Sequence, residues 1–125
     1  MKRIDSFTIS PWTDWIYGVI TQSKIQGELL EDFLTLVYKH YGKVVVICQP
    51  LENGYAYTFA QKQKIVTLDS LLQILSRQEF GWTVSKGILH SPRPSKLSLD
   101  SLEAAIVAAR SKTLVSQKEG TGNRE

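Results

Sequence analysis

Side chains that commonly carry out catalysis are few in this sequence of 125 residues, and they are far apart. It contains two histidines, His40 and His90, and one cysteine, Cys48. Neither histidine has a cysteine, a second histidine or an acidic residue at the spacing that metal binding or nucleophilic catalysis requires. Cys48 lies in an apolar run, where we expect a buried and unreactive thiol. We therefore expect no enzyme, no metal site and no cofactor.

Aromatic and basic residues are more numerous, and they suggest binding of nucleic acid. An aromatic ring that stacks on a base contributes ~1–3 kcal/mol, and basic side chains neutralise the phosphates. On an exposed sheet face, the rings that would stack on bases are Tyr17, Tyr55 and Tyr57. The side chains that would neutralise phosphates are Lys62, Lys64, Lys86 and Arg93. A second interpretation stays open, because Tyr55, Tyr57 and Phe59 alternate with small residues and would also suit a core beneath helices.

The elements that must position these residues are arranged around residues 43–61, KVVVICQPLENGYAYTFAQ. Two runs of β-branched and aromatic residues flank the turn-forming residues 50–54, and this pattern predicts a β-hairpin. The first strand, residues 44–48, is apolar throughout and is typical of a strand buried on both faces. The second strand, residues 55–60, alternates large and small side chains, so its two faces should have different neighbours.

Hydrophobic periodicity predicts a strand at residues 14–21, a helix over 26–41, a second helix over 70–78 and a last strand over 82–89. Together with the hairpin, this order predicts an α+β fold of the ferredoxin-like (βαββαβ) type. Such a fold has a four-stranded antiparallel sheet with both helices on one face. Its strand order places the apolar residues 44–48 at a sheet edge, which would invite pairing with another chain. Either another segment covers that edge, or the edge joins a dimer, or the strand order is different.

The chain on either side of this predicted domain, residues 14–90, divides into four parts. Residues 1–13 form an N-terminal arm or a short strand. Residues 91–97 form a loop, because their two prolines suit neither a helix nor a central strand. Residues 98–115 form a C-terminal helix with a narrow apolar stripe. Residues 116–125, SQKEGTGNRE, are polar and predict a disordered tail.

The predicted domain resembles the RNA-recognition motif family. The similar residues are Ile16-Tyr17, the segment HYGKV at 40–44 and the segment NGYAY at 53–57. The resemblance implies that aromatic residues of the sheet stack on bases of single-stranded RNA. By position, Tyr55 and Tyr57 match the longer motif of the family, and Tyr17 matches the aromatic residue of the shorter one. Asn53 departs from the family pattern, which has lysine or arginine there, so one phosphate contact is missing.

The overall composition agrees with a binding protein of the cytoplasm. The net charge of +3 and the pI near 9.0 are mildly basic, as in many proteins that bind nucleic acid. No apolar run approaches the ~18 residues of a membrane span, and the first ten residues lack the apolar core of a signal peptide. We therefore expect a non-catalytic, cytoplasmic binding domain, with single-stranded RNA as its first candidate ligand.

The alternative is a module for protein–protein interaction or assembly. Another protein, or a second copy of this chain, would then pair with the apolar strand at 44–48 or pack on the C-terminal helix. The side chains that would form this surface are Val44, Val46, Leu99, Leu102 and Ile106.

Overall fold

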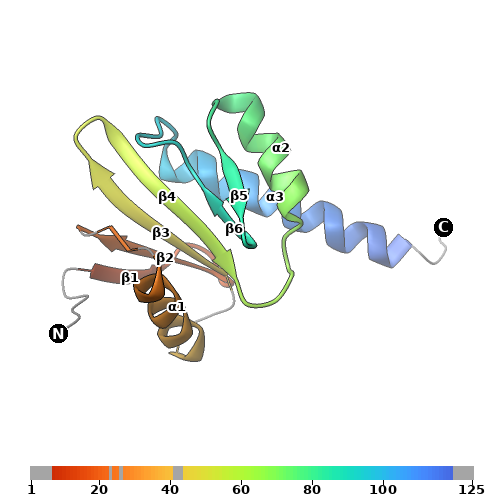
Figure 1. The fold of residues 1–125 in the computed structure, drawn as a ribbon. Coiled ribbons are helices and arrows are strands. Elements are labelled where there is room, and N and C mark those ends of the chain that lie inside the picture. The colour runs from red at the N-terminus through yellow and green to blue at the C-terminus, as the bar shows by residue number, and fades with distance from the viewer. Residues whose placement is uncertain (1–6, 23, 26, 41–43, 120–125) are drawn as a thin grey trace.

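The computed structural model of the chain describes residues 7–22, 24–25, 27–40 and 44–119, with side chains described between Thr8 and Arg110 (Figure 1). Its helices are α1 (Glu28–His40), α2 (Leu68–Gln78) and α3 (Leu99–Glu119). Its strands are β1 (Phe7–Pro11), β2 (Ile16–Thr21), β3 (Val44–Leu51), β4 (Gly54–Gln61), β5 (Thr83–Ser85) and β6 (Ile88–His90). No helix in this part of the chain combines the length and the apolar character needed to cross a membrane.

The strands form one six-stranded mixed sheet in the order β1-β2-β3-β4-β6-β5. Strands β2 and β3 are parallel and are connected through α1, whereas every other neighbouring pair in this sheet is antiparallel. The predicted four-stranded antiparallel, ferredoxin-like sheet is therefore wrong. Strand β3 lies between β2 and β4, so its backbone is paired on both sides and presents no edge. The observed strand order therefore leaves the apolar residues 44–48 in the interior of the sheet and not at an exposed edge.

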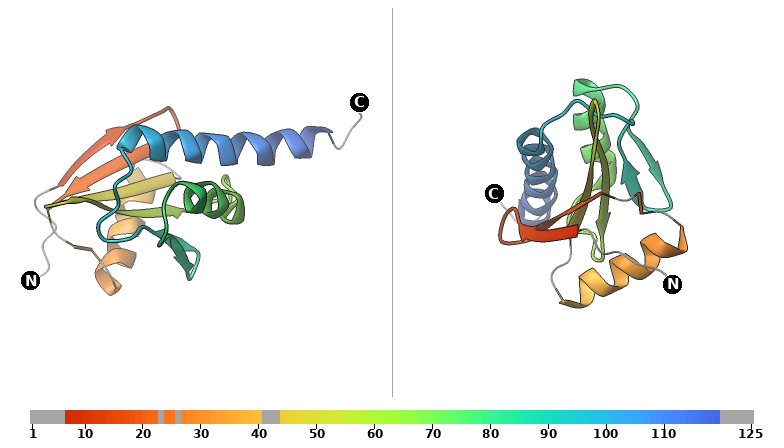
Figure 2. Two further views of the ribbon diagram at one scale, coloured as in Figure 1. Left: turned by 90° about the horizontal axis from the view of Figure 1, so that it is seen from above. Right: turned by 90° about the vertical axis from the view of Figure 1, so that its left-hand side faces the viewer.

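The helices cover both faces of the sheet rather than one (Figure 2). On one face, Phe33 and Val37 of α1 pack with Val45 of β3. On the opposite face, α2 and α3 enclose a larger core that includes Val46 of β3 and Phe59 of β4. Because helices lie on each side, every side chain at 44–48 is buried, as predicted from its unbroken apolar run. The prediction that the first two helices share one face is wrong.

Two hairpins enlarge the sheet at its ends. The N-terminal strand β1 pairs with β2, and the side chain of Trp12 between them packs directly over Gly18. Near the other end, where we predicted one bent strand over 82–89, the chain forms two short strands, β5 and β6. The turn between them has positive φ angles at Lys86 (54°) and Gly87 (77°), as in the mirror-image turns that suit two-residue hairpins.

The residues predicted to form a protein-interaction surface lie inside this domain. Val44, Val46, Leu102 and Ile106 are each 0% exposed, and Leu99 packs against the same core. Helix α3 therefore packs on the sheet as part of the fold, and the residues of its predicted apolar stripe up to Ala109 lie in that contact. Helix α3 continues to Glu119, into the segment predicted to be a disordered tail. Residues 1–6 of the predicted arm, 41–43 of the family resemblance and 120–125 of the tail lie outside the described residues.

Candidate functional site

The three tyrosines expected to stack on bases do not share one face of the sheet. Tyr17 is paired with Val45, whose side chain packs against α1. Tyr55 and Tyr57 belong to the opposite face, where they pack into the core beneath α2 and α3. Adjacent residues on neighbouring strands point to the same face, so Tyr17 is separated from the other two rings by the sheet itself. A single platform of these three rings does not exist.

Tyr57 is a core residue, as in the second interpretation of its alternating pattern. Its side chain is 2% exposed, and its ring stacks between Tyr55, at 5.6 Å, and Trp82, at 6.3 Å between centroids. Its hydroxyl donates a hydrogen bond of 2.7 Å to the carbonyl oxygen of Leu97. Burial raises the pKa of this hydroxyl, with smaller contributions in the same direction from Cys48, Tyr55 and Glu79. The ring is therefore occupied by protein contacts on both sides and leaves no face for a base.

The basic residues, by contrast, gather on the α1 face of the sheet. Lys62 and Lys64 follow β4, Lys86 lies in the β5–β6 turn, and all three line one cavity of about 600 Å³. We call this the lysine cavity. Arg93 lines a second cavity of about 210 Å³, the Arg93 cavity, together with Lys24. Of the four predicted phosphate-binding residues, three therefore line the lysine cavity and the fourth lines the Arg93 cavity.

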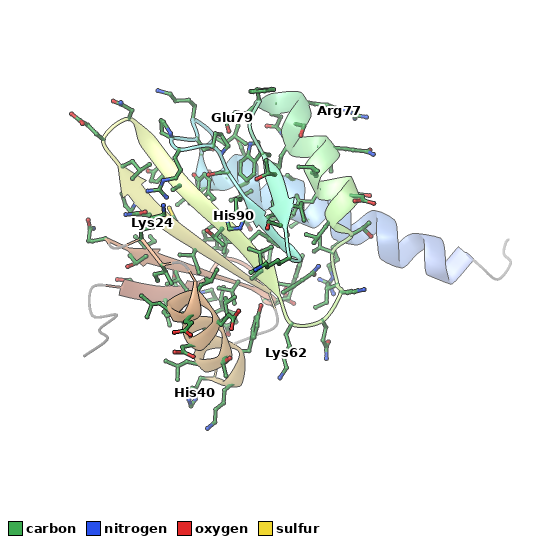
Figure 3. The ribbon with its side chains drawn as sticks, viewed as in Figure 1. Lys24, His40, Lys62, Arg77, Glu79 and His90 are labelled. Carbon is green, nitrogen blue, oxygen red and sulfur yellow. The ribbon has the colours of Figure 1, made fainter. Side chains whose placement is uncertain are left out.

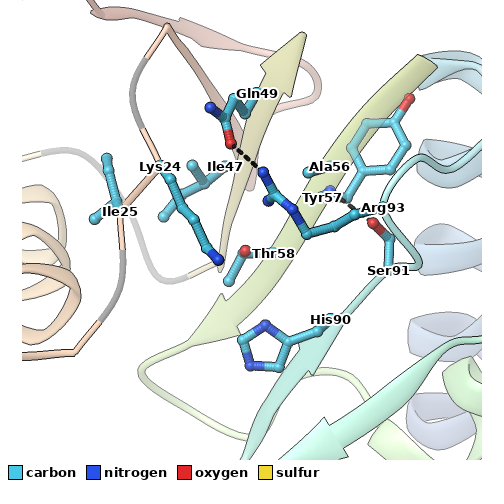
Figure 4. Close-up of a pocket in the computed structure, with 10 residues that line it drawn as sticks. All are labelled: Lys24, Ile25, Ile47, Gln49, Ala56, Tyr57, Thr58, His90, Ser91 and Arg93. Atoms are coloured by element: carbon cyan, nitrogen blue, oxygen red, sulfur yellow. Dashed lines mark hydrogen bonds between the residues drawn. The ribbon is translucent and has the colours of Figure 1, made fainter. Parts of the chain in front are cut away.

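The Arg93 cavity is built on strands β3, β4 and β6 and on the loop before α1 (Figure 4). Its floor includes Gln49 and Thr58, and Arg93 Nη2 donates a hydrogen bond of 3.1 Å to Gln49 Oε1 across it. The close-up shows the ammonium group of Lys24 and the ring of His90 on the same side of the sheet as the Arg93 guanidinium. No aspartate or glutamate is among the described residues that line this cavity.

Arg93 is held above the sheet by a bulge whose two ends are paired with β4. At one end the Ser91 amide donates to the Tyr57 carbonyl at 3.1 Å, and the Tyr57 amide donates to Ser91 Oγ at 2.9 Å. At the other end Tyr55 and Ser95 exchange two backbone hydrogen bonds of 3.0 and 2.7 Å. The three residues between these pairs cannot follow β4 in register, so they arch outward with Arg93 at their centre.

Glu79, just after α2, anchors the far end of this bulge. Its carboxylate accepts hydrogen bonds from Ser95 Oγ at 2.6 Å, from the Lys96 amide at 2.6 Å and from Trp82 Nε1 at 3.0 Å. The carboxylate therefore ties the end of α2 to Trp82 and to the backbone at 95–96, on the side of the sheet that holds the larger core. Glu79 thus positions the 91–97 segment, and it is not among the residues that line the Arg93 cavity.

Gln61 positions the segment that carries two of the three lysines. Its side-chain oxygen accepts hydrogen bonds from the amides of Ile65 (3.1 Å) and Val66 (3.0 Å). Its side-chain nitrogen donates to the Val66 carbonyl at 2.8 Å. These bonds hold the loop at 62–64 against the end of β4. They therefore fix the backbone that carries Lys62 and Lys64.

His90, Tyr38 and Asp69 are further titratable side chains that line the two cavities. Burial lowers the pKa of His90, so its ring is uncharged at neutral pH in the absence of a ligand. Burial raises the pKa of Tyr38, which lines the lysine cavity, to about 12. Asp69 is the one acidic residue among the described residues that line the lysine cavity. Lysine and arginine thus determine the sign of the electrostatic potential in both cavities.

Neither Lys24 nor His90 was predicted to be part of a site. Lys24 is a single basic residue in a short loop, and nothing in its neighbourhood of sequence distinguishes it from a solvated lysine. One local feature could have identified His90. It lies two residues after Ile88 in β6, so its side chain points to the same face of the sheet as Ile88, which packs against the core beneath α1. His40, at the end of α1, lies away from His90 (Figure 3).

Metal-binding side chains do not converge within the described part of the chain. No group of three or more histidine, cysteine, aspartate or glutamate side chains that could hold a metal ion occurs there. Cys48 is buried in β3, and burial raises the pKa of its thiol to about 11, which keeps it in the weakly nucleophilic neutral form.

Comparison with protein-family models and with curated proteins finds no match for this chain. The strand order and the burial of Tyr57 differ from the ferredoxin-like sheet and the exposed aromatic face that we expected.

Proposed function

We propose that this protein is a non-catalytic binding domain for single-stranded RNA, and that the strand lies on the α1 face of the sheet. The observation that carries the proposal is the pair of neighbouring cavities with basic side chains from separate segments. Phosphate contacts dominate the affinity of proteins for nucleic acid, and they need basic side chains at several points along the strand. The tyrosine platform has no part in this proposal.

The positions of the cavities support a continuous path between them. Thr58 and His90, which are paired across β4 and β6, line the Arg93 cavity. Ala60 and Ile88, two residues further along the same strands, line the lysine cavity. Two residues of a strand span roughly 7 Å, so the cavities adjoin on one face of the sheet. A flexible single strand that occupies one cavity can reach the other.

The path also contains flat rings on which bases can stack. Tyr38 contributes one side of the lysine cavity, and the His90 ring lies in the Arg93 cavity. Stacking on such rings tolerates any base, because every base has a π face. We therefore expect affinity for single strands with modest preference for sequence.

The test is fluorescence anisotropy of a labelled single-stranded RNA, titrated with the protein over a range of salt concentrations. Five phosphate contacts, one for each lysine or arginine of the two cavities, at ~0.7 each predict a slope of log K against log salt of about −3.5. Lys62→Ala should weaken binding and make the slope shallower by about 0.7.

Arg77→Ala is the matched control, because it also removes one cation, from α2 on the opposite face of the sheet (Figure 3). It should leave both the affinity and the slope unchanged. Equal losses from Lys62→Ala and Arg77→Ala would show that binding depends only on net charge, and the proposed path would then be wrong.

A further inference from the structure

The Arg93 cavity has a more specific character than the lysine cavity, because it surrounds a smaller volume with three groups that can carry positive charge. Lys24 comes from the loop before α1, His90 from β6 and Arg93 from the bulge after β6. The cavity has a volume of about 210 Å³, and none of its described lining residues is acidic. A charge cluster of this kind, uncompensated by carboxylates, suits a compact and strongly anionic group.

The donors of this cavity are largely available to a ligand. The Arg93 guanidinium has five N–H groups, of which one binds Gln49 among the described residues. Among the same residues, no hydrogen bond or ion pair is made by the Lys24 ammonium, the His90 ring or the Thr58 hydroxyl. The Ser91 hydroxyl is already engaged, since it accepts from the Tyr57 amide and donates to the Pro92 carbonyl at 2.7 Å.

The number of cationic groups matches a phosphate monoester better than a phosphodiester. A monoester carries about −1.5 to −2 charges at pH 7, whereas each diester of an RNA backbone carries one. Lys24 and Arg93 together balance a doubly charged group, and the His90 ring can offer an N–H donor beside them. Arginine also offers the planar pair of donors that binds phosphate oxygens in a bidentate manner.

The position of the Arg93 cavity on the sheet suits the end of an RNA chain. The loop at Lys24 and Ile25 and the bulge at Arg93 bound the cavity, and the lysine cavity adjoins it along β4 and β6. We propose that the Arg93 cavity binds a terminal phosphate monoester of a single-stranded RNA, whose chain continues across the sheet toward the lysine cavity. This inference rests on the proposed function, to which it adds recognition of a phosphorylated end.

The experiment compares three labelled RNA strands of one sequence: one with a 5′-phosphate, one with a 3′-phosphate and one with hydroxyls at both ends. Anisotropy titrations at physiological salt should show at least about tenfold tighter binding of one phosphorylated strand than of the hydroxyl-ended strand. Arg93→Gln and Lys24→Ala should reduce that advantage to less than about twofold. Arg77→Ala should preserve it, because Arg77 lies on the other side of the sheet.

Far-ultraviolet circular dichroism of each variant establishes that it is folded before its affinity is interpreted. Salt-dependent binding with equal affinity for all three strands would overturn the terminal-phosphate inference and leave the proposed function intact. Absence of binding to any strand would overturn both. A titration with inorganic phosphate alone, followed by the shift in thermal unfolding temperature, is the remaining measurement. Phosphate that stabilises the protein through Arg93 and Lys24 when no RNA strand binds would reject the RNA end as the ligand.

Discussion

Replacement of Glu79 by alanine tests whether the carboxylate after α2 holds the bulge at residues 91–95 in place. Glu79 accepts three hydrogen bonds, and two of their donors, Ser95 Oγ and Trp82 Nε1, belong to buried residues. A hydrogen bond to a charged group contributes ~1.5–3 kcal/mol, and an exposed one contributes less. Counting only the two buried donors at the lower figure, Glu79→Ala should reduce the free energy of unfolding by about 3 kcal/mol.

The assay is urea denaturation followed by far-ultraviolet circular dichroism, with tryptophan fluorescence as a second probe because Trp82 loses a partner. Glu52→Ala is the control, since Glu52 is an exposed acidic residue in the turn between β3 and β4. The control should change the free energy of unfolding by less than about 0.5 kcal/mol. A loss below about 1 kcal/mol for Glu79→Ala would refute the argument that this carboxylate fastens the 91–97 segment to the core.

Two further predictions concern the interior of the sheet and the Arg93 cavity. Gly18→Ala should destabilise the protein by about 1–3 kcal/mol, because its added methyl group would overlap the Trp12 ring, and most of that cost should disappear in a Trp12→Ala background. Persistence of the full cost in the double variant, measured by thermal unfolding, would place its origin elsewhere. Burial lowers the pKa of His90 in the folded protein, so the unfolded chain binds the proton first as the pH falls. The free energy of unfolding should therefore decrease as the pH falls from about 6.5 toward the folded-state pKa, and urea denaturation of His90→Gln should lack that part of the decrease.

The location of the cavities also explains why a binding function on this fold leaves the tyrosines of β4 out of reach. Tyr55 and Tyr57 belong to the face that α2 and α3 cover, and that face holds the larger core. The α1 face is covered by one helix, and the part that β4 and β6 contribute carries the two cavities. The proposed RNA path therefore lies on the less covered face, where the lysine and arginine side chains of the two cavities are exposed to solvent.

Local features of the sequence determined where the helices and most of the strands lie. The leucine and phenylalanine periodicity before residue 41 corresponds to α1, and the turn-forming cluster at 50–54 corresponds to the hairpin of β3 and β4. The unbroken apolar run at 44–48 also indicated burial on both faces, which the structure confirms. These features depend on residues a few positions apart, whose spacing is set by the geometry of a helix or a strand.

Tertiary structure alone decided which strands are neighbours and which face each helix covers. The parallel pairing of β2 with β3, and the packing of α1 opposite α2 and α3, join segments far apart in the chain. The alternation of Tyr55 and Tyr57 with small residues indicated that both rings lie on one face of the sheet. Only the packing of α2 and α3 on that face buries them in the core. Lys24, His90 and Arg93 become neighbours for the same reason, because strand pairing across the sheet brings together residues whose separation in sequence carries no periodic signal.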